Sequence, residues 1–149
     1  MRLLLLLVSA LAFTALPGCG PDRSVEERVF ACRDRWKDKD ALKDPEQLRL
    51  ALDCFTPGTR PIAEAVQTQK GEVVYPVRLD RLLDYDEATG EAEIERQSAI
   101  IALKKGRTIH RVFLELDATD NVWRIDLLEL PRFWQPLDDW LRSGRPTYA

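Results

Sequence analysis

Two periodicities of apolar residues divide the chain. Apolar positions recur at helical spacing up to about residue 70, and from residue 77 they alternate with polar positions as in a strand. The first helix is expected to begin at Ser24-Val25-Glu26-Glu27, a capping box in which hydroxyl and carboxylate satisfy each other's backbone amides. The residues predicted for its buried face are Val25, Val29, Cys32 and Trp36.

A second helix is expected to follow residue 44. Asp44 suits the N-cap and Pro45 the first helical position. Segment 56–61 is rich in turn residues and should end this helical hairpin, and a short third helix would then run through 62–66 and stop before Gly71. The residues predicted for the buried face of the second helix are Leu48, Ala51, Leu52 and Phe55.

The remaining pattern predicts a four-stranded antiparallel meander. The expected strands are 77–85, 92–103, 108–116 and 122–130, joined by turns at 86–90, 104–107 and 117–121. Both faces of the second strand become apolar at Ile100 and Ile101, so we expect it to be covered on both sides. Asp80 and Asp84 are out of phase with the apolar positions and should face solvent. Helices followed by antiparallel strands indicate an α+β fold.

The C-terminal segment 130–141 is rich in aromatic residues. Pro136 suits the first turn of a helix that ends near Gly144, with Leu137, Trp140 and Leu141 on one face. One interpretation is that this helix packs over the sheet or closes its open end. The other is a partner-binding surface, formed by Phe133, Trp134 and Trp140.

The N-terminus carries a targeting signal. The apolar run 3–16 follows a basic residue and, at 1.5 Å per residue, spans roughly 21 Å, which is short for a membrane helix. Leu16-Pro17-Gly18-Cys19 resembles the bacterial lipoprotein box, in which the cysteine is lipidated. The domain division is therefore a signal peptide at 1–18, a tether at 19–23 and one α+β domain at 24–149. The alternative is a plain secretory signal with an incidental cysteine.

The targeting signal predicts the cellular location. A lipidated Cys19 would anchor the protein in the membrane of a bacterial cell envelope, on the periplasmic or outer-surface side. Gly20, rather than Asp, follows this cysteine, which by the usual enterobacterial sorting rule favours the outer membrane. With Cys19 used by lipid, Cys32 and Cys54 form an even pair in an oxidising compartment, and we expect a disulfide across the helical hairpin. The alternative is two buried free thiols.

Two short sequences and the order of elements resemble the nuclear transport factor 2-like superfamily. The sequences are Asn121-Val122-Trp123-Arg124-Ile125-Asp126-Leu127, similar to a late strand of that family, and Leu52-Asp53-Cys54-Phe55-Thr56-Pro57, similar to its helix-to-loop junction. The resemblance implies a cone in which a curved sheet wraps around the N-terminal helices. It also implies that an active member, such as a steroid isomerase or polyketide cyclase, would place an Asp, His or Tyr inside the cone.

Composition and charge narrow the function. The chain has 149 residues with 22 basic and 25 acidic side chains, so the net charge of −3 gives no indication of nucleic-acid binding. One histidine and three cysteines, without a recognisable motif, predict neither a metal site nor a cofactor. His110 is in phase with Val112 and Leu114, which makes it the candidate catalytic base, although a position on the rim of the cone fits equally well. The turn with Lys104, Lys105 and Arg107 suits a solvated tip or a contact with anionic lipid headgroups.

Three hypotheses for function follow. The first is a lipid-anchored, non-catalytic binding or interaction domain that takes an envelope protein or a small apolar ligand. The second is a small isomerase- or cyclase-like enzyme that uses His110 inside a cone pocket. The third is a purely structural component of the envelope. An interior filled by side chains would remove both the enzyme and the small-ligand hypotheses.

Overall fold

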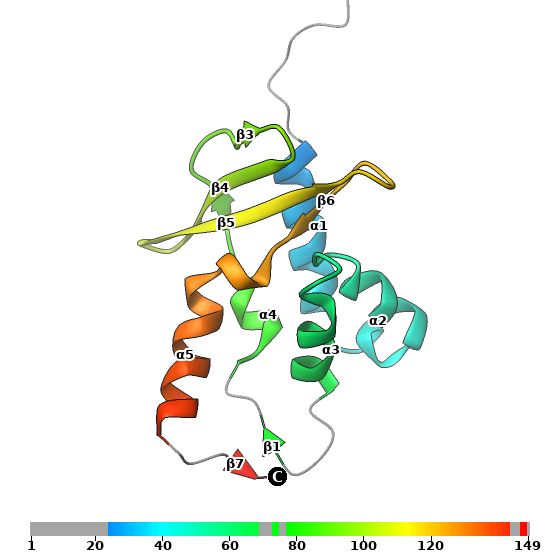
Figure 1. Ribbon diagram of the computed structural model, residues 1–149, viewed down its shortest axis with the longest axis vertical. Coiled ribbons are helices and arrows are strands. Elements are labelled where there is room, and N and C mark those ends of the chain that lie inside the picture. Colours follow the sequence, from blue (N-terminus) through cyan, green and yellow to red (C-terminus); the bar gives the residue numbers. More distant parts are fainter. Residues whose placement is uncertain (1–23, 69–72, 75–76, 144–146, 149) are drawn as a thin grey trace, which may run out of the picture.

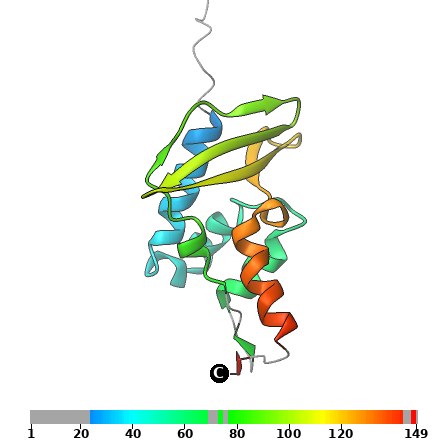
Figure 2. The same ribbon diagram turned by 90° about the vertical axis from the view of Figure 1, so that its left-hand side faces the viewer.

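The computed structural model describes residues 24–68, 73–74, 77–143 and 147–148, and it has an α+β fold (Figures 1 and 2). The proposed signal peptide, the tether and Cys19 lie outside the described residues. The helices are α1 (Ser24–Lys37), η1 (Ala41–Lys43), α2 (Pro45–Leu52), α3 (Arg60–Thr68), α4 (Leu79–Leu82), η2 (Leu127–Glu129) and α5 (Pro131–Arg142). Among them, none is both long enough and apolar enough to cross a bilayer.

The strands form a curled antiparallel sheet that resembles half a barrel, with α1 lying across it against β4 and β6 (Figure 1). Five strands are hydrogen-bonded in the order β2-β4-β5-β6, with β3 on the same edge of β4 as β2. A separate pair joins β1 to β7. The bounds are β1 (Val73–Val74), β2 (Glu87–Ala88), β3 (Glu93–Glu95), β4 (Ser98–Lys105), β5 (Thr108–Asp117), β6 (Val122–Ile125) and β7 (Thr147–Tyr148).

The N-terminal helical hairpin agrees with the prediction. All four residues expected on the inner face of α1 are buried. The Asp44 carboxylate accepts hydrogen bonds from the backbone N–H groups of Glu46 and Gln47 at 2.9 and 3.0 Å, and this cap begins α2. The disulfide between Cys32 and Cys54 is confirmed, with 5.7 Å between the two Cα atoms. It joins α1 to the residues that follow α2.

The predicted strand 77–85 is wrong, because its centre forms helix α4. Leu79, Leu82 and Leu83 are all buried, and their spacing of three and four residues suits one helical face. A strand would have turned Leu82 and Leu83 to opposite faces. Asp80 and Asp84 are half-buried rather than fully solvated, and they form ion pairs with Lys39 at 3.2 Å and Lys37 at 2.9 Å.

The predicted strand 92–103 is interrupted. A tight turn at Arg96, whose φ of 55° lies in the left-handed region, separates β3 from β4 and folds them into a hairpin. On β4 the face carrying Ala99 and Ile101 is buried, whereas Ile100 on the other face is half-buried. The expectation that both faces are covered is therefore met only in part.

The last two predicted boundaries also shift. Strand β6 ends at Ile125 rather than at residue 130, because the Asp126 carboxylate accepts the Leu128 N–H at 2.9 Å and begins η2. Trp123 is 8% exposed and belongs to the core. Helix α5 begins at Pro131, so Pro136 lies inside the helix instead of starting it. Pro131 takes the first helical position just as well, since its missing N–H would have no partner there.

Candidate functional site

A hollow of about 440 Å³ lies between β5 and the start of α5. Strand β6 pairs with β5 only from Leu114 to Asp117, so the first half of β5 has no neighbouring strand on that side among the described residues. Figure 1 shows this half of β5 (yellow) continuing past β6, with η2 and α5 (orange) below it. The residues that line the hollow are Ile109, His110, Arg111, Phe113, Leu130, Pro131 and Arg132.

His110 is part of the wall of this hollow, half-buried and in phase with the buried Val112 and Leu114. Burial, and secondarily the positive charge of Arg132, lower the pKa of His110 below its ordinary value. No carboxylate of the described residues contacts the imidazole. The structure therefore gives this histidine a position at a pocket without the acidic partner that would orient a general base.

Tyr85 lies next to His110, with 6.3 Å between the two ring centroids. The Tyr85 side chain is fully buried, and its hydroxyl has no hydrogen-bond partner in the described part of the chain. Burial raises the pKa of Tyr85 to about 12, although the nearby Arg132 guanidinium opposes that shift. The hydroxyl is thus protonated at neutral pH and remains available as a donor.

Arg132 brings a positive charge to the same place. Its guanidinium donates to the backbone carbonyls of Leu82 and Arg81 at 3.3 and 3.4 Å and lies 6.0 Å from the Tyr85 ring centroid. Within the described ranges, Arg132 forms no ion pair with a carboxylate, and the same holds for Arg81 and for Arg111. The hollow therefore has mainly apolar walls and two arginines, Arg111 and Arg132, that form no ion pair with a carboxylate of the described residues.

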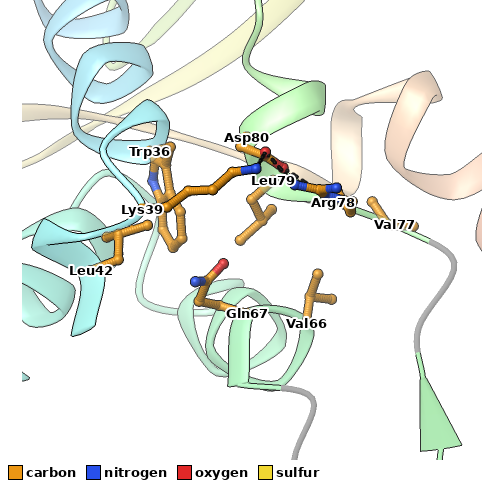
Figure 3. A pocket seen from close by; sticks show the side chains of 9 residues that line it. All are labelled: Trp36, Lys39, Leu42, Val66, Gln67, Val77, Arg78, Leu79 and Asp80. Carbon is orange, nitrogen blue, oxygen red and sulfur yellow. Dashed lines mark hydrogen bonds and ion pairs between the residues drawn. The ribbon is translucent and has the colours of Figure 1, made fainter. Parts of the chain in front are cut away.

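A second hollow, of about 390 Å³, shows the opposite arrangement (Figure 3). Trp36, Leu42, Val66 and Leu79 are among its apolar lining residues. Lys39 and Arg78 stand at its rim, but both bind the Asp80 carboxylate, at 3.2 and 2.7 Å. Because its cations are already compensated, this hollow is less suited to an anionic ligand than the one beside α5.

The most connected charged group of the sheet is Arg124, which is 5% exposed. It pairs with three carboxylates, those of Asp53 at 2.8 Å, Asp117 at 2.9 Å and Asp120 at 2.7 Å. Arg28 and Arg60 also bind Asp53, at 3.4 and 3.0 Å. We call these six residues the Arg124 network. It joins α1, α3, the end of α2 and the β5–β6 turn, and its charges are used within the protein.

The predicted aromatic surface is only partly present. Phe133 is fully buried and packs edge-on against Trp134, with ring centroids 5.4 Å apart, so it cannot contact a partner at the surface. Trp134 is 38% exposed, and its indole N–H donates to the Leu128 carbonyl at 2.6 Å. Leu141, expected on the packed face, is 61% exposed, and Trp140 is half-buried. The buried anchor of α5 is thus Phe133, not the predicted C-terminal face.

The charges of the β4–β5 turn are largely paired. Lys104 binds Glu87 at 2.8 Å, and Lys105 binds Asp84 at 2.9 Å and Asp86 at 3.2 Å. These lysines hold the turn to β2 and to the residues just before it, which favours the interpretation as a solvated tip over a contact with lipid headgroups.

Sequence reasoning selected His110 but missed Tyr85 and Arg132. Tyr85 falls within the predicted strand 77–85, and Arg132 precedes the first turn predicted for the C-terminal helix. Neither stands in a motif, and only the folded chain brings them together. The described residues include no group of three or more His, Cys, Asp or Glu side chains that could hold a metal ion. Comparisons with protein-family models, with curated proteins and with solved structures gave no match to this chain.

Proposed function

We propose that the chain is a lipid-anchored, non-catalytic binding domain of a bacterial cell envelope. Its anchor would be Cys19, and Gly20 favours sorting to the outer membrane. Its ligand would have an apolar body and an anionic group, and would occupy the hollow between β5 and α5. We also propose a nuclear transport factor 2-like cone for the fold, supported by the helices-then-sheet order, the curled sheet and the buried Trp123.

The observation that carries the proposed binding function is the uncompensated charge at an apolar hollow. Arg132 is half-buried and has no carboxylate partner among the described residues, so an anion in the hollow would meet an uncompensated positive charge. A carboxylate or sulfonate beside Arg132 could also accept a hydrogen bond from the Tyr85 hydroxyl, for which the described chain offers no acceptor. Ile109, Phe113 and Leu130 would contact the apolar body.

Binding is better supported than catalysis by the same geometry. A general base of the isomerase type needs a group that orients it, and within the described part of the chain His110 has Tyr85 and Arg132 nearby but no carboxylate. Burial, and secondarily the positive charge of Arg132, lower the pKa of His110 and so work against a protonated imidazole.

The pocket is tested by titrating the protein with anilinonaphthalene sulfonate, which combines apolar rings with an anion, and displacing it with octanoate. Arg132→Gln should weaken both ligands about tenfold, since one charge-assisted hydrogen bond is lost. Arg142→Gln is the matched control, because Arg142 is on the same helix but exposed and paired with Asp138 at 2.7 Å. Equal affinities of the two variants would contradict the proposed site.

The anchor is tested separately by detergent-phase partition of the full chain expressed in bacteria. Wild type should enter the detergent phase, and Cys19→Ser should remain in the aqueous phase or accumulate unprocessed. A Cys19→Ser protein that partitions like wild type would contradict lipidation.

A further inference from the structure

The part of β5 before Leu114 has no neighbouring strand on its β6 side among the described residues. It therefore offers backbone hydrogen-bonding groups as well as a hollow. The Leu116 N–H donates to the Gln97 carbonyl at 2.8 Å, on the β4 side, whereas the Phe113 carbonyl accepts the Asp126 N–H at 2.9 Å, on the β6 side. Along a strand, the backbone N–H and C=O groups of successive residues point alternately to one neighbouring strand and to the other. The β4–β5 register is continuous from Ser98↔Glu115 to Lys105↔Thr108, so this alternation is not interrupted. The backbone N–H and C=O groups of Ile109 and Arg111 therefore point to the open edge.

This open edge is basic. Segment 106–114 contains Arg107, His110 and Arg111 and no acidic residue, and Arg132 of α5 stands across the hollow. By contrast, the outer strand on the opposite side of the sheet, β3, presents exposed Glu93 and Glu95. The Ile109 side chain is 60% exposed and adds an apolar contact to the basic edge. An edge with unpaired backbone groups, positive charge and an adjacent hollow is suited to an extended acidic chain.

We propose that an extended acidic peptide segment of an envelope partner protein adds to this edge as a further antiparallel strand. Its backbone would pair with Ile109 and Arg111, its carboxylates would meet Arg111 and Arg132, and an apolar side chain would enter the hollow. The inference rests on the proposed binding function and names the ligand class for the same site.

Charge and chemistry favour this occupant over two others. A second copy that joined through the same edge would bring two Arg111 side chains to one face of the combined sheet, where like charges repel. An anionic lipid headgroup could meet Arg111 and Arg132, but it has no peptide backbone to pair with the N–H and C=O groups of Ile109. The free backbone edge thus distinguishes a peptide from a lipid.

The test is calorimetric titration of the full chain in detergent micelles with a capped hexapeptide of alternating glutamate and valine. Ile109→Pro removes an N–H that points to the open edge and leaves the bonds to β4, whereas Ile109→Ala shortens the same side chain and keeps the N–H. We expect about a tenfold weaker affinity for Ile109→Pro and less than about a threefold change for Ile109→Ala. The glutamine analogue of the peptide should also bind about tenfold more weakly. Circular dichroism checks that both variants fold.

The outcomes separate this inference from the proposed function. If the peptide fails to bind while anilinonaphthalene sulfonate still binds in an Arg132-dependent way, strand addition is wrong and the anion pocket stands. If neither binds, both are wrong. Equal weakening by Ile109→Pro and Ile109→Ala would overturn backbone pairing. Sedimentation or vesicle flotation that shows edge-dependent self-association or binding to phosphatidylglycerol, in place of peptide binding, would assign the edge to a different occupant and overturn the proposal.

Discussion

Arg124 and Arg132 are both shielded from solvent beside the same curled sheet, but their surroundings differ. Arg124 is 5% exposed and pairs with three aspartates, the most distant at 2.9 Å. Arg132 is half-buried, and in the described part of the protein it meets only two carbonyls, at 3.3 and 3.4 Å, and the face of Tyr85. One region is a closed network of charges, and the other leaves a charge beside an apolar hollow.

The comparison separates structural charge from charge that is available to a ligand. A buried arginine whose carboxylates are supplied by three different segments holds those segments together, and its removal leaves the carboxylates uncompensated. An arginine without a carboxylate contributes little to folding, so its loss should change stability little and ligand binding much. Substitutions in the Arg124 network should therefore lower stability and leave ligand binding unchanged, and a substitution at Arg132 should do the reverse.

The largest effect on stability is expected from removing the disulfide next to the Arg124 network. Cys54 follows Asp53 directly, and its bond to Cys32 closes a loop with a sequence separation of 22 residues. A Cys32→Ala, Cys54→Ala protein should lose about 3 kcal/mol of unfolding free energy in the chain-entropy model, measured by urea denaturation. Anion binding, measured under conditions where the variant is folded, should be unchanged. An unaltered denaturation midpoint would contradict this.

Arg124→Gln should follow, with a loss of about 2–3 kcal/mol, because Asp53, Asp117 and Asp120 lose their common partner. This is at or below the range for fully buried pairs, since these aspartates are partly solvated. Arg49→Gln is the matched control, as it breaks an exposed pair with Glu46 and should change stability by less than about 0.5 kcal/mol. Similar effects of both substitutions would show that the Arg124 network stabilises the fold no more than an exposed ion pair does.

Acid should weaken the Arg124 network and the ion pairs by which Asp84 links Lys37 of α1 to Lys105 of β4. Hydrogen bonds from Lys37 and Lys105 lower the pKa of Asp84 to about 2, and Arg124 lowers the pKa of Asp120. Because these pKa values are lower in the folded state than in the unfolded state, their stabilisation is present above about pH 4 and is lost as the pH falls through the folded values. Urea unfolding should show a lower midpoint at about pH 3 than at about pH 6.

Asp84→Asn is the control for the effect of acid. Asp84→Asn should show a smaller difference between the two pH values than wild type, because one of the titrating groups is gone. A difference as large as that of wild type would assign the acid sensitivity to other carboxyls.

A small effect on stability is expected at Tyr85. Its hydroxyl is buried without a partner in the described chain, so Tyr85→Phe should change the unfolding free energy by less than about 1 kcal/mol, in either direction. Binding of anilinonaphthalene sulfonate should nevertheless weaken, because the hydroxyl is a proposed donor to the anion. A loss of stability above about 2 kcal/mol would reveal a protein partner for the hydroxyl and remove it from the site.

Local signals predicted the N-terminal half well. The Asp44 cap, the spacing of Val25, Val29 and Cys32, and the disulfide all depend on residues close in sequence or on pairing arithmetic. The strand prediction for 77–85 failed, because two adjacent leucines, Leu82 and Leu83, are buried together, and alternation alone does not reveal that. The turn at Arg96 that separates β3 from β4 was not predicted, because a residue other than glycine takes the left-handed position.

The site was less predictable than the fold. His110 could be selected because it is the only histidine and alternates in phase with Val112. The role proposed for Arg132 depends on its contacts in the folded chain. Its hydrogen-bond acceptors are the carbonyls of Arg81 and Leu82, about 50 residues away in the sequence. The same limit applies to Arg124, whose partner Asp53 is separated from it by 71 residues.

The central claim is tested most directly by crossing the two arginines in two assays, urea unfolding and titration with anilinonaphthalene sulfonate. Arg124→Gln should lower the unfolding free energy by about 2–3 kcal/mol and leave the affinity unchanged. Arg132→Gln should leave the unfolding free energy within about 1 kcal/mol of wild type and weaken the affinity about tenfold. If Arg132→Gln binds the probe as wild type does, or if Arg124→Gln weakens binding equally while still folded, the division between a closed network and an open anion site is wrong.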